Sequence, residues 1–252
     1  MKALVLEQIE NKTLAAVKDI ALPALADGDV LVDIDWSSLN YKDALAITGK
    51  GKIVRQFPMV PGIDFSGRVS ESRDPRFVPG QSVILTGWGV GENHWGGLAA
   101  QACVKGDWLV SLPDALSARN AMIIGTAGFT AMLCVDALVE AGVKPESGKV
   151  LAKVLAQTNY RGCVAACGLA GGFDLPTTVM PFILRNVRLQ GVDSVMVPTA
   201  ERAAVWARLA SLLPESYYQQ ASTEIGLEQA PAFAADFLSN KIQGRTLVKI
   251  NG

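Results

Sequence analysis

The hydrophobic period of this chain changes once, close to residue 113, and this change limits the fold more than any other feature. Before it, turns rich in Gly and Pro separate short apolar runs at a spacing of roughly 8–12 residues, which is typical of a barrel or sandwich. A short helix is predicted over Leu39–Ile47, ending at Gly49. The predicted strands are Val30–Trp36, Asp64–Val69, Ser82–Trp88, Leu98–Val104 and Trp108–Leu112.

After Ser117 the pattern is that of helices alternating with a few strands. Strands are predicted over Cys163–Cys167, Val187–Val192 and Thr246–Ile250. Helices are predicted from Ser117 and over Thr126–Ala141, Lys149–Gln157, Met180–Arg185, Ala200–Leu213 and Leu227–Asn240. The sequence therefore predicts a mixed α/β chain, in which a β-rich half is followed by an α/β half.

Composition excludes several classes of protein. Hydrophobic residues make up 50% of the 252 residues and charged ones 19%, whereas intrinsic disorder needs few apolar residues and many charges. The net charge of −1 gives no electrostatic reason to expect nucleic acid or an anionic membrane as a partner. Neither nucleic acid nor a membrane is therefore expected as a partner.

Neither a membrane span nor a secretory signal is expected. A spanning helix needs about 18 or more apolar residues, and the uncharged stretch Ala121–Val135 is too short, while Gly162–Phe173 is interrupted by glycines. At the N-terminus only Ala3–Leu6 is apolar before Glu7. The predicted location is the cytoplasm.

Cysteine and histidine are too few for most metal or hydrolase sites. Cys103, Cys134, Cys163 and Cys167 have no metal-like spacing and are expected to be reduced structural thiols, Cys163 and Cys167 sharing one face of a buried strand. His94 is the single histidine, which argues against a zinc site and a Ser-His-Asp triad.

Several motifs together resemble one enzyme superfamily. The general motifs are Val60-Pro-Gly-Ile-Asp-Phe-Ser-Gly67, Pro79-Gly-Gln-Ser-Val83, Gly96-Gly-Leu-Ala99 and Gly125-Thr-Ala-Gly-Phe-Thr-Ala131. Their order resembles that of the medium-chain dehydrogenase/reductase superfamily. Narrower motifs are Ser38-Leu-Asn-Tyr-Lys-Asp43, Thr86-Gly-Trp-Gly-Val-Gly-Glu-Asn-His-Trp95 and Ile242-Gln-Gly-Arg-Thr246. They resemble the acryloyl-CoA reductase branch, which is often labelled quinone oxidoreductase.

The resemblance implies a GroES-like β-barrel that holds substrate and a Rossmann domain that holds NADPH. The implied reaction is hydride transfer to the β-carbon of an α,β-unsaturated thioester, followed by protonation at the α-carbon. Zinc-dependent relatives carry Gly-His-Glu where this chain has Gly62-Ile-Asp64, which implies a zinc-free member.

The dinucleotide-binding fingerprint that the resemblance predicts is missing. A strand and a Gly-rich turn leading into a helix are needed to bring backbone N–H groups to the pyrophosphate. Here Lys144–Gly148 leads directly into Lys149–Val154. Neither Gly87–Gly91 nor Gly168–Gly172 has the required context or spacing. The sequence thus predicts a truncated Rossmann remnant, joined at 148/149, with weak or absent NADPH binding.

Tyr41 is the predicted catalytic residue. By resemblance it faces the nicotinamide and the substrate, where a phenol can donate a hydrogen bond to the thioester oxygen or relay a proton. The alternative is a core tyrosine on a short helix. Asn40 and Asp43 are predicted to cap the start of that helix. The predicted cofactor-binding residues, again by resemblance, are Tyr41, Leu169, Ile183, Ser194 and Arg245.

Three weaker candidates remain. His94, beside Trp95, is predicted to be a hydrogen-bonded structural histidine rather than a group facing the CoA thioester. The cluster Lys50, Lys52 and Arg55 could contact CoA phosphates, with a solvated loop as the default. Asn186–Asp193 resembles the outer strand that pairs between subunits in the family, which predicts a homodimer.

The predicted domains are a GroES-like barrel over 1–124, a nucleotide-binding remnant over 125–194, and a return to the barrel over 195–252. The predicted activity is NADPH-dependent reduction of acryloyl-CoA to propionyl-CoA. The alternatives are a catalytically silent barrel that binds acyl-CoA or serves a structural role, and an NADPH:quinone oxidoreductase acting on an enone.

Overall fold

The computed structural model describes residues 1–140, 151–168, 174–219, 222–239 and 241–251, and these form two compact units. Unit 1 comprises Met1–Gly128 and Val195–Gly252, and unit 2 comprises Phe129–Ser194. The boundary on the helix between them lies after Gly128, whereas the sequence motifs place it after Ile124.

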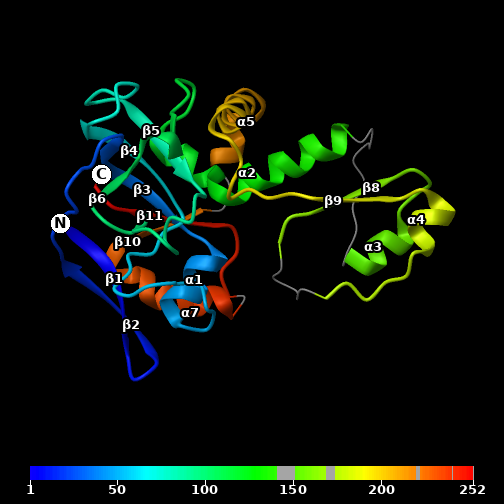
Figure 1. The fold of residues 1–252 in the computed structure, drawn as a ribbon, viewed down its shortest axis with the longest axis horizontal. Helices are drawn as coiled ribbons and strands as arrows, with labels where there is room; N and C mark the ends of the chain where they lie inside the picture. The colour runs from blue at the N-terminus through cyan, green and yellow to red at the C-terminus, as the bar shows by residue number, and fades with distance from the viewer. Residues whose placement is uncertain (141–150, 169–173, 220–221, 240, 252) are drawn as a thin grey trace. The chain divides into compact units, whose positions relative to one another are not determined.

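Unit 1 contains most of the regular structure (Figure 1). Its strands are β1 (Lys2–Ile9), β2 (Lys12–Asp19), β3 (Asp29–Leu39), β4 (Asp64–Ser72), β5 (Ser82–Thr86), β6 (Gln101–Lys105), β7 (Leu109–Ser111), β10 (Ser222–Gly226) and β11 (Arg245–Lys249). Its helices are α1 (Tyr41–Thr48), η1 (Gly106–Trp108), the first part of α2 (Ala118–Glu140), α5 (Thr199–Leu212), α6 (Glu215–Tyr218), η2 (Leu227–Gln229) and α7 (Ala230–Leu238).

The central sheet of unit 1 has the order β10-β11-β3-β4-β5-β7, with β6 also paired to β3. The long strand β3 pairs along one edge with β4, and along the other with β6 over its first half and β11 over its second. Because β11 lies against β3, a strand from the end of the chain reaches the start of α1. A separate antiparallel hairpin, β1–β2, packs beside this sheet.

Of the three apolar clusters in unit 1, two are large. One lies inside the sheet and includes Ile34, Phe65 and Leu85, all of them fully buried. The other joins β1 to α1 and α7, which lie side by side in Figure 1, and includes Leu39, Ile47 and Ala234. This packing follows the apolar spacing of both helices and fixes α1 against the sheet. Gly49, with φ of 67°, ends α1 as predicted.

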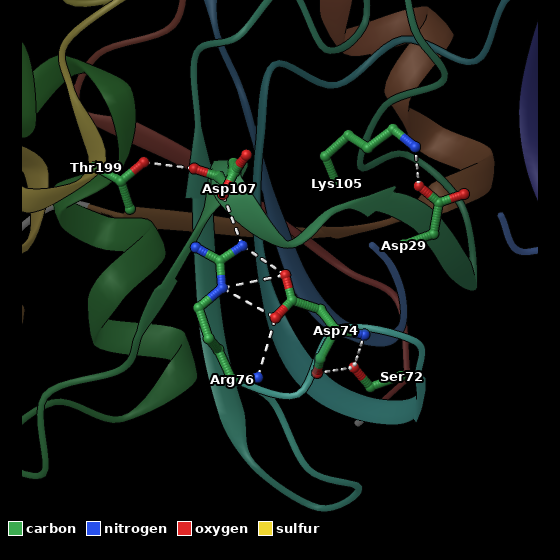
Figure 2. A network of polar contacts seen from close by, with 7 residues as sticks. All are labelled: Asp29, Ser72, Asp74, Arg76, Lys105, Asp107 and Thr199. Carbon is green, nitrogen blue, oxygen red and sulfur yellow. Dashed lines mark hydrogen bonds and ion pairs between the residues drawn. The ribbon is translucent and has the colours of Figure 1, made fainter. Parts of the chain in front are cut away.

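A network of polar contacts links several segments of unit 1 (Figure 2). The Arg76 guanidinium donates to both carboxylate oxygens of Asp74, which lowers the pKa of Asp74, and it also contacts Asp107. Thr199, the first residue of α5, donates to the backbone oxygen of Asp107. The Lys105 ammonium pairs with Asp29 across β6 and β3. These contacts tie the turn after β4 to η1 and to α5.

Unit 2 is much smaller. It contains the rest of α2, then α3 (Leu151–Gln157), β8 (Cys163–Ala166), α4 (Met180–Arg185) and β9 (Arg188–Gly191). In the described residues its only sheet is the parallel pair β8–β9. The Arg185 guanidinium donates to the backbone oxygens of Thr158 and Leu155, which attaches α4 to the end of α3.

Two sequence predictions need correction, and some elements were not predicted. The cysteine pair does not share a strand face, because β8 ends at Ala166 and leaves Cys167 exposed while Cys163 is buried. Leu227–Asn240 divides into a 3₁₀ turn and α7. The N-terminal hairpin and β10 were missed altogether.

The expectation about membrane spans also changes. Among the described residues, α2 is long and apolar enough to cross a membrane by length and composition, with 39% of its most apolar window buried. It is interrupted at Gly125, where φ is 53° and ψ is −163°, and Ala121–Ile124 before the break is in the core of unit 1. The break divides α2 into two shorter helices.

Candidate functional site

The predicted catalytic residue Tyr41 is the first residue of α1 and is 45% exposed. This exposure argues against the alternative of a core tyrosine, because a phenol packed in the core would be shielded from solvent. The packing of α1 on α7 and the sheet fixes the backbone that carries Tyr41. The phenol is therefore presented to solvent from a rigid base, which suits contact with a ligand.

Next to Tyr41 in the chain, Asn40 belongs to a set of buried and partly buried polar side chains, here called the buried network. Its members are Ser38, Asn40, Asp43, Asp64, Thr126 and Arg245. They come from β3, the start of α1, β4, α2 and β11. Sequence reasoning named Tyr41 and Arg245 as site residues and Asn40 and Asp43 as caps, and it missed the other three. Ser38, Asp64 and Thr126 all lie within the motifs quoted above. The signal that could have identified them was a polar residue inside an apolar run.

Asp64 is the centre of this network. Its side chain is fully buried, and Oδ1 accepts hydrogen bonds from the backbone N–H and hydroxyl of Ser38, at 3.2 and 2.6 Å. Oδ2 accepts from Asn40 Nδ2 at 3.0 Å and from the backbone N–H and hydroxyl of Thr126, at 2.9 and 2.7 Å. Five donors thus compensate the burial of one carboxylate.

Asp43 is a second buried carboxylate. Its Oδ2 accepts from the backbone N–H of Asn40, the helix-start contact that the sequence predicted, and its Oδ1 accepts from the N–H groups of Gly62 and Ile63, all at 3.0 Å. Burial, followed by the nearby charge of Asp64, raises the pKa of Asp43 to about 7. The predicted capping box of Asn40 and Asp43 is present at the start of α1, and Asn40 Nδ2 also donates into the network, to Asp64 and to Ser38.

Arg245 supplies the cation of the network. Its Nη2 donates to Ser38 Oγ at 2.6 Å and to the backbone oxygen of Met122 at 3.4 Å, and its Nη1 donates to Asn40 Oδ1 at 3.2 Å. The Nε atom is buried and has no partner in the described structure. The predicted role of Arg245 toward a cofactor is not tested by these contacts and stays a prediction.

The other predicted cofactor residues lie in unit 2 or outside the described residues. Leu169 and the proposed junction at 148/149 belong to the latter. Ile183, on α4, is 69% exposed, and Ser194 is the last residue of unit 2, partly buried. Within unit 1 the structure brings Arg245 to Asn40, the neighbour of Tyr41.

The weaker candidates are His94, which has local contacts, and the basic cluster after α1. His94 Nδ1 lies 3.2 Å from the backbone oxygen of Trp95, and its ring meets that of Trp108 edge-on at 5.0 Å, an arrangement that fits a structural role. Lys50, Lys52 and Arg55 are all exposed.

A cavity of about 570 Å³ lies in unit 2, lined by residues of α3, α4 and the segment before α4. Its lining is mainly apolar, and its one charged group, Arg185, is already engaged by two backbone oxygens. It offers no group for acid–base or nucleophilic chemistry, so the buried network with Tyr41 is the better candidate site.

Comparison with known proteins matches this fold to one family. Residues 26–114 match the alcohol dehydrogenase GroES-like domain. The chain is 55% identical to a probable acrylyl-CoA reductase, AcuI, of Escherichia coli over 324 aligned positions, with all of both chains covered. It is 35% identical to a putative quinone oxidoreductase, YhfP, of Bacillus subtilis over 325 positions, covering 99% of this chain and 98% of the relative.

A solved structure agrees. The yhdH oxidoreductase from Salmonella enterica, in complex with NADP, is 56% identical and superposes with a TM-score of 0.95, covering all of both chains. The alignment with the Escherichia coli relative spans 324 positions whereas this chain has 252 residues, so at least 72 aligned positions (324 less 252) have no residue here. Identity at this level over the whole chain shows that the protein belongs to the medium-chain dehydrogenase/reductase family of oxidoreductases.

Proposed function

We propose that this chain is an NADPH-dependent reductase of the carbon–carbon double bond of acryloyl-CoA, giving propionyl-CoA and NADP⁺ with uptake of one proton. The observation that carries the proposal is the full-length similarity to an acrylyl-CoA reductase, at 55% identity. The exposed Tyr41, which follows Asn40 of the buried network in the chain, supports it.

In this proposal the residues of unit 1 act on the substrate. The Tyr41 phenol donates a hydrogen bond to the thioester oxygen, which stabilises the negative charge that develops there when the β-carbon is reduced. NADPH, when bound, supplies the hydride. The buried network holds the backbone beneath Tyr41 and does not itself contact the substrate. Leu169, Ile183 and Ser194 stay predictions for the nicotinamide end of the cofactor.

The described residues fit the nicotinamide end of NADPH better than its pyrophosphate end. Unit 2 retains one β–α–β connection, β8–α4–β9, whose helix has 6 residues and carries Pro181 in its first turn. A pyrophosphate site needs several free N–H groups at the start of a longer helix. We therefore propose that this chain binds NADPH more weakly than its relatives do, and no step is assigned to the phosphate end.

The test is NADPH binding by the purified chain, followed by cofactor fluorescence and calorimetry, with acryloyl-CoA turnover in the same sample. Binding with turnover that falls at least about tenfold in Tyr41→Phe is the expected result. No binding at millimolar NADPH would overturn the proposal and favour the silent barrel. Faster reduction of a quinone than of acryloyl-CoA, at equal concentrations, would favour the quinone oxidoreductase.

A homodimer, and a cytoplasmic location, remain proposals. The strand β9 was predicted within Asn186–Asp193 and is one of the two strands of the unit 2 sheet. We propose that it pairs with β9 of a second copy, because an edge strand is a ready pairing surface. Light scattering during size-exclusion chromatography tests this, and a monomer at micromolar concentration would exclude it.

A further inference from the structure

We infer that the basic cluster of Lys50, Lys52 and Arg55, on the loop after α1, binds the phosphates of the CoA part of the substrate. The inference rests on the proposed function, because it takes acryloyl-CoA as the substrate and Tyr41 as the residue at the thioester. It adds where the other end of the substrate is held. The phosphates of NADPH offer the same chemistry, and the experiment separates the two sources.

The loop after α1 carries a local excess of positive charge. Between Asp43 and Asp64, which are both buried, the sequence contains three cations and no acidic residue. The whole chain has a net charge of −1, so this excess is not a general property of its surface. Positive charge confined to one exposed loop attracts a polyanion, and salt screens that attraction.

The three cations of the basic cluster are exposed, and in the part of the chain that the structure describes none of them pairs with a carboxylate. Other exposed cations of unit 1 do have such partners. They include Lys2, Lys18 and Arg68. A carboxylate bonded to a cation competes with a phosphate for it, so the basic cluster is available to an external anion.

The loop that carries the basic cluster is held in place by its own apolar residues. Ile53, Val54 and Phe57 pack against the apolar cluster that joins β1 to α1 and α7. Gly51 lies close to α1, because a Cβ on Gly51 would be 3.1 Å from Cβ of Leu45. With the backbone fixed in this way, binding has only side chains to order, which lowers its entropic cost.

The loop also returns toward the start of α1. Lys50 lies beyond the C-terminal end of the helix, which has 8 residues and is therefore about 12 Å long. The backbone N–H of Arg55 donates to the backbone oxygen of Glu92 at 3.1 Å. The Glu92 carboxylate pairs at 2.7 Å with Lys42, the residue after Tyr41. The basic cluster therefore extends from beyond the end of α1 back toward the end that carries Tyr41.

This arrangement suits the shape and charge of CoA. A long pantetheine arm separates the thioester of CoA from its phosphates, so a substrate whose thioester meets Tyr41 must place its phosphates away from that residue. The pyrophosphate and the 3′-phosphate are separate anionic groups, which fits cations spread along a loop. The Arg55 guanidinium can bind one phosphate through two hydrogen bonds, whereas each lysine acts as a point charge.

The first arm of the experiment measures binding without turnover. Calorimetry gives the Kd of propionyl-CoA for the wild type and for the cluster variant Lys50→Gln/Lys52→Gln/Arg55→Gln. Each exposed contact contributes modestly, so the three are removed together. We expect the Kd of propionyl-CoA to rise about tenfold, and the Kd of NADPH to change less than about threefold.

The matched control is Lys2→Gln/Lys18→Gln/Arg68→Gln, which removes two lysines and one arginine from ion pairs elsewhere on unit 1. Its Kd for propionyl-CoA should change less than about threefold, because these charges are not in contact with the ligand. An unchanged Kd in the cluster variant, equal rises in both variants, or no binding by the wild type at millimolar propionyl-CoA would overturn the inference. A rise in Kd for NADPH alone would also overturn it, since the basic cluster would then serve the cofactor.

The second arm compares two substrates under turnover. Acryloyl-pantetheine keeps the thioester and the arm of acryloyl-CoA but has no phosphate. We expect the preference for acryloyl-CoA, taken as the ratio of the two kcat/KM values, to be about tenfold smaller in the cluster variant than in the wild type. An equal preference in both would contradict the inference. If the wild type binds propionyl-CoA but reduces neither substrate, the proposed function has failed and the binding arm alone decides the inference.

Discussion

The two units of this chain differ in how completely their apolar side chains are buried in the folded state. Unit 1 has a seven-stranded sheet and contains three apolar clusters. Its buried carboxylates and guanidinium are linked to one another or to backbone groups. Unit 2 has a two-stranded parallel sheet, and its exposed large apolar side chains include Val139, Val179, Ile183 and Leu184.

This difference shows how the number of paired strands sets the completeness of a core. Parallel sheets are normally covered on both faces, and a sheet of two strands is marginal by itself. Among the described residues, unit 2 has such a sheet and carries the exposed apolar side chains named above. Unit 1 joins seven strands in one sheet, and every residue of the buried network belongs to unit 1.

Replacing one leucine in each unit tests the comparison most strongly. Leu85 is fully buried in the unit 1 sheet, and Leu184 on α4 is 62% exposed. Leu85→Ala should lower the free energy of unfolding by about 2–5 kcal/mol, because it leaves a cavity. Leu184→Ala should change it by less than about 0.5 kcal/mol.

Urea unfolding is followed by tryptophan fluorescence and by far-ultraviolet circular dichroism. All five tryptophans lie in unit 1, so their fluorescence reports on that unit, whereas dichroism reports on both. A loss above about 1 kcal/mol in Leu184→Ala would show that something covers α4 in solution. That outcome would contradict the contrast between a buried core in unit 1 and exposed apolar residues in unit 2. It would favour association of two copies through unit 2.

The pH dependence of unit 1 gives the next largest effect. The pKa of Asp43 is raised to about 7 in the folded chain, against about 3.9 when unfolded. The folded state therefore holds this proton more tightly. The resulting stability is fully present below about pH 4, is lost as the pH rises, and is gone above about pH 7. We expect the free energy of unfolding to fall by about 2–3 kcal/mol between pH 5 and 8, measured by urea unfolding with tryptophan fluorescence.

Two variants sharpen this measurement. Asp43→Asn should remove the slope between pH 5 and 8. Asp74→Asn should keep it, because the Arg76 side chain lowers the pKa of Asp74 and places its titration below that window. If the free energy of unfolding of Asp43→Asn still falls between pH 5 and 8, a group other than Asp43 titrates there.

Thiol reactivity gives the smallest effect, because it changes only the rates at which the cysteines are modified. Cys167 is exposed, whereas burial and the neighbouring Cys167 raise the pKa of Cys134 to about 12. Because the thiolate is the reactive form, iodoacetamide at pH 8 should modify Cys167 first and Cys134 more than about tenfold more slowly. Peptide mass spectrometry over time measures both. Equal rates would mean that unit 2 opens faster than the reagent reacts.

Much of unit 1 could be predicted from sequence because its strands alternate and its turns contain Gly or Pro. The N-terminal hairpin escaped prediction for a local reason. Its turn residues, Glu10 and Asn11, both have positive φ, and Glu-Asn is a far weaker hairpin signal than Asn-Gly. The strand β10 escaped because it is short, with only Ile225 fully buried among Ser222–Gly226.

The sequence by itself determined the change from a β-rich half to an α/β half, the short helix that contains Tyr41 and the family motifs, since period and turn chemistry are local. Only the tertiary structure decided that Arg245, which follows Asn40 by 205 positions, would join it and Asp64 beneath that helix. This meeting depends on β11 pairing with β3 and on the break at Gly125. No local pattern encodes which strands become neighbours, because pairing is settled by the burial of the whole sheet.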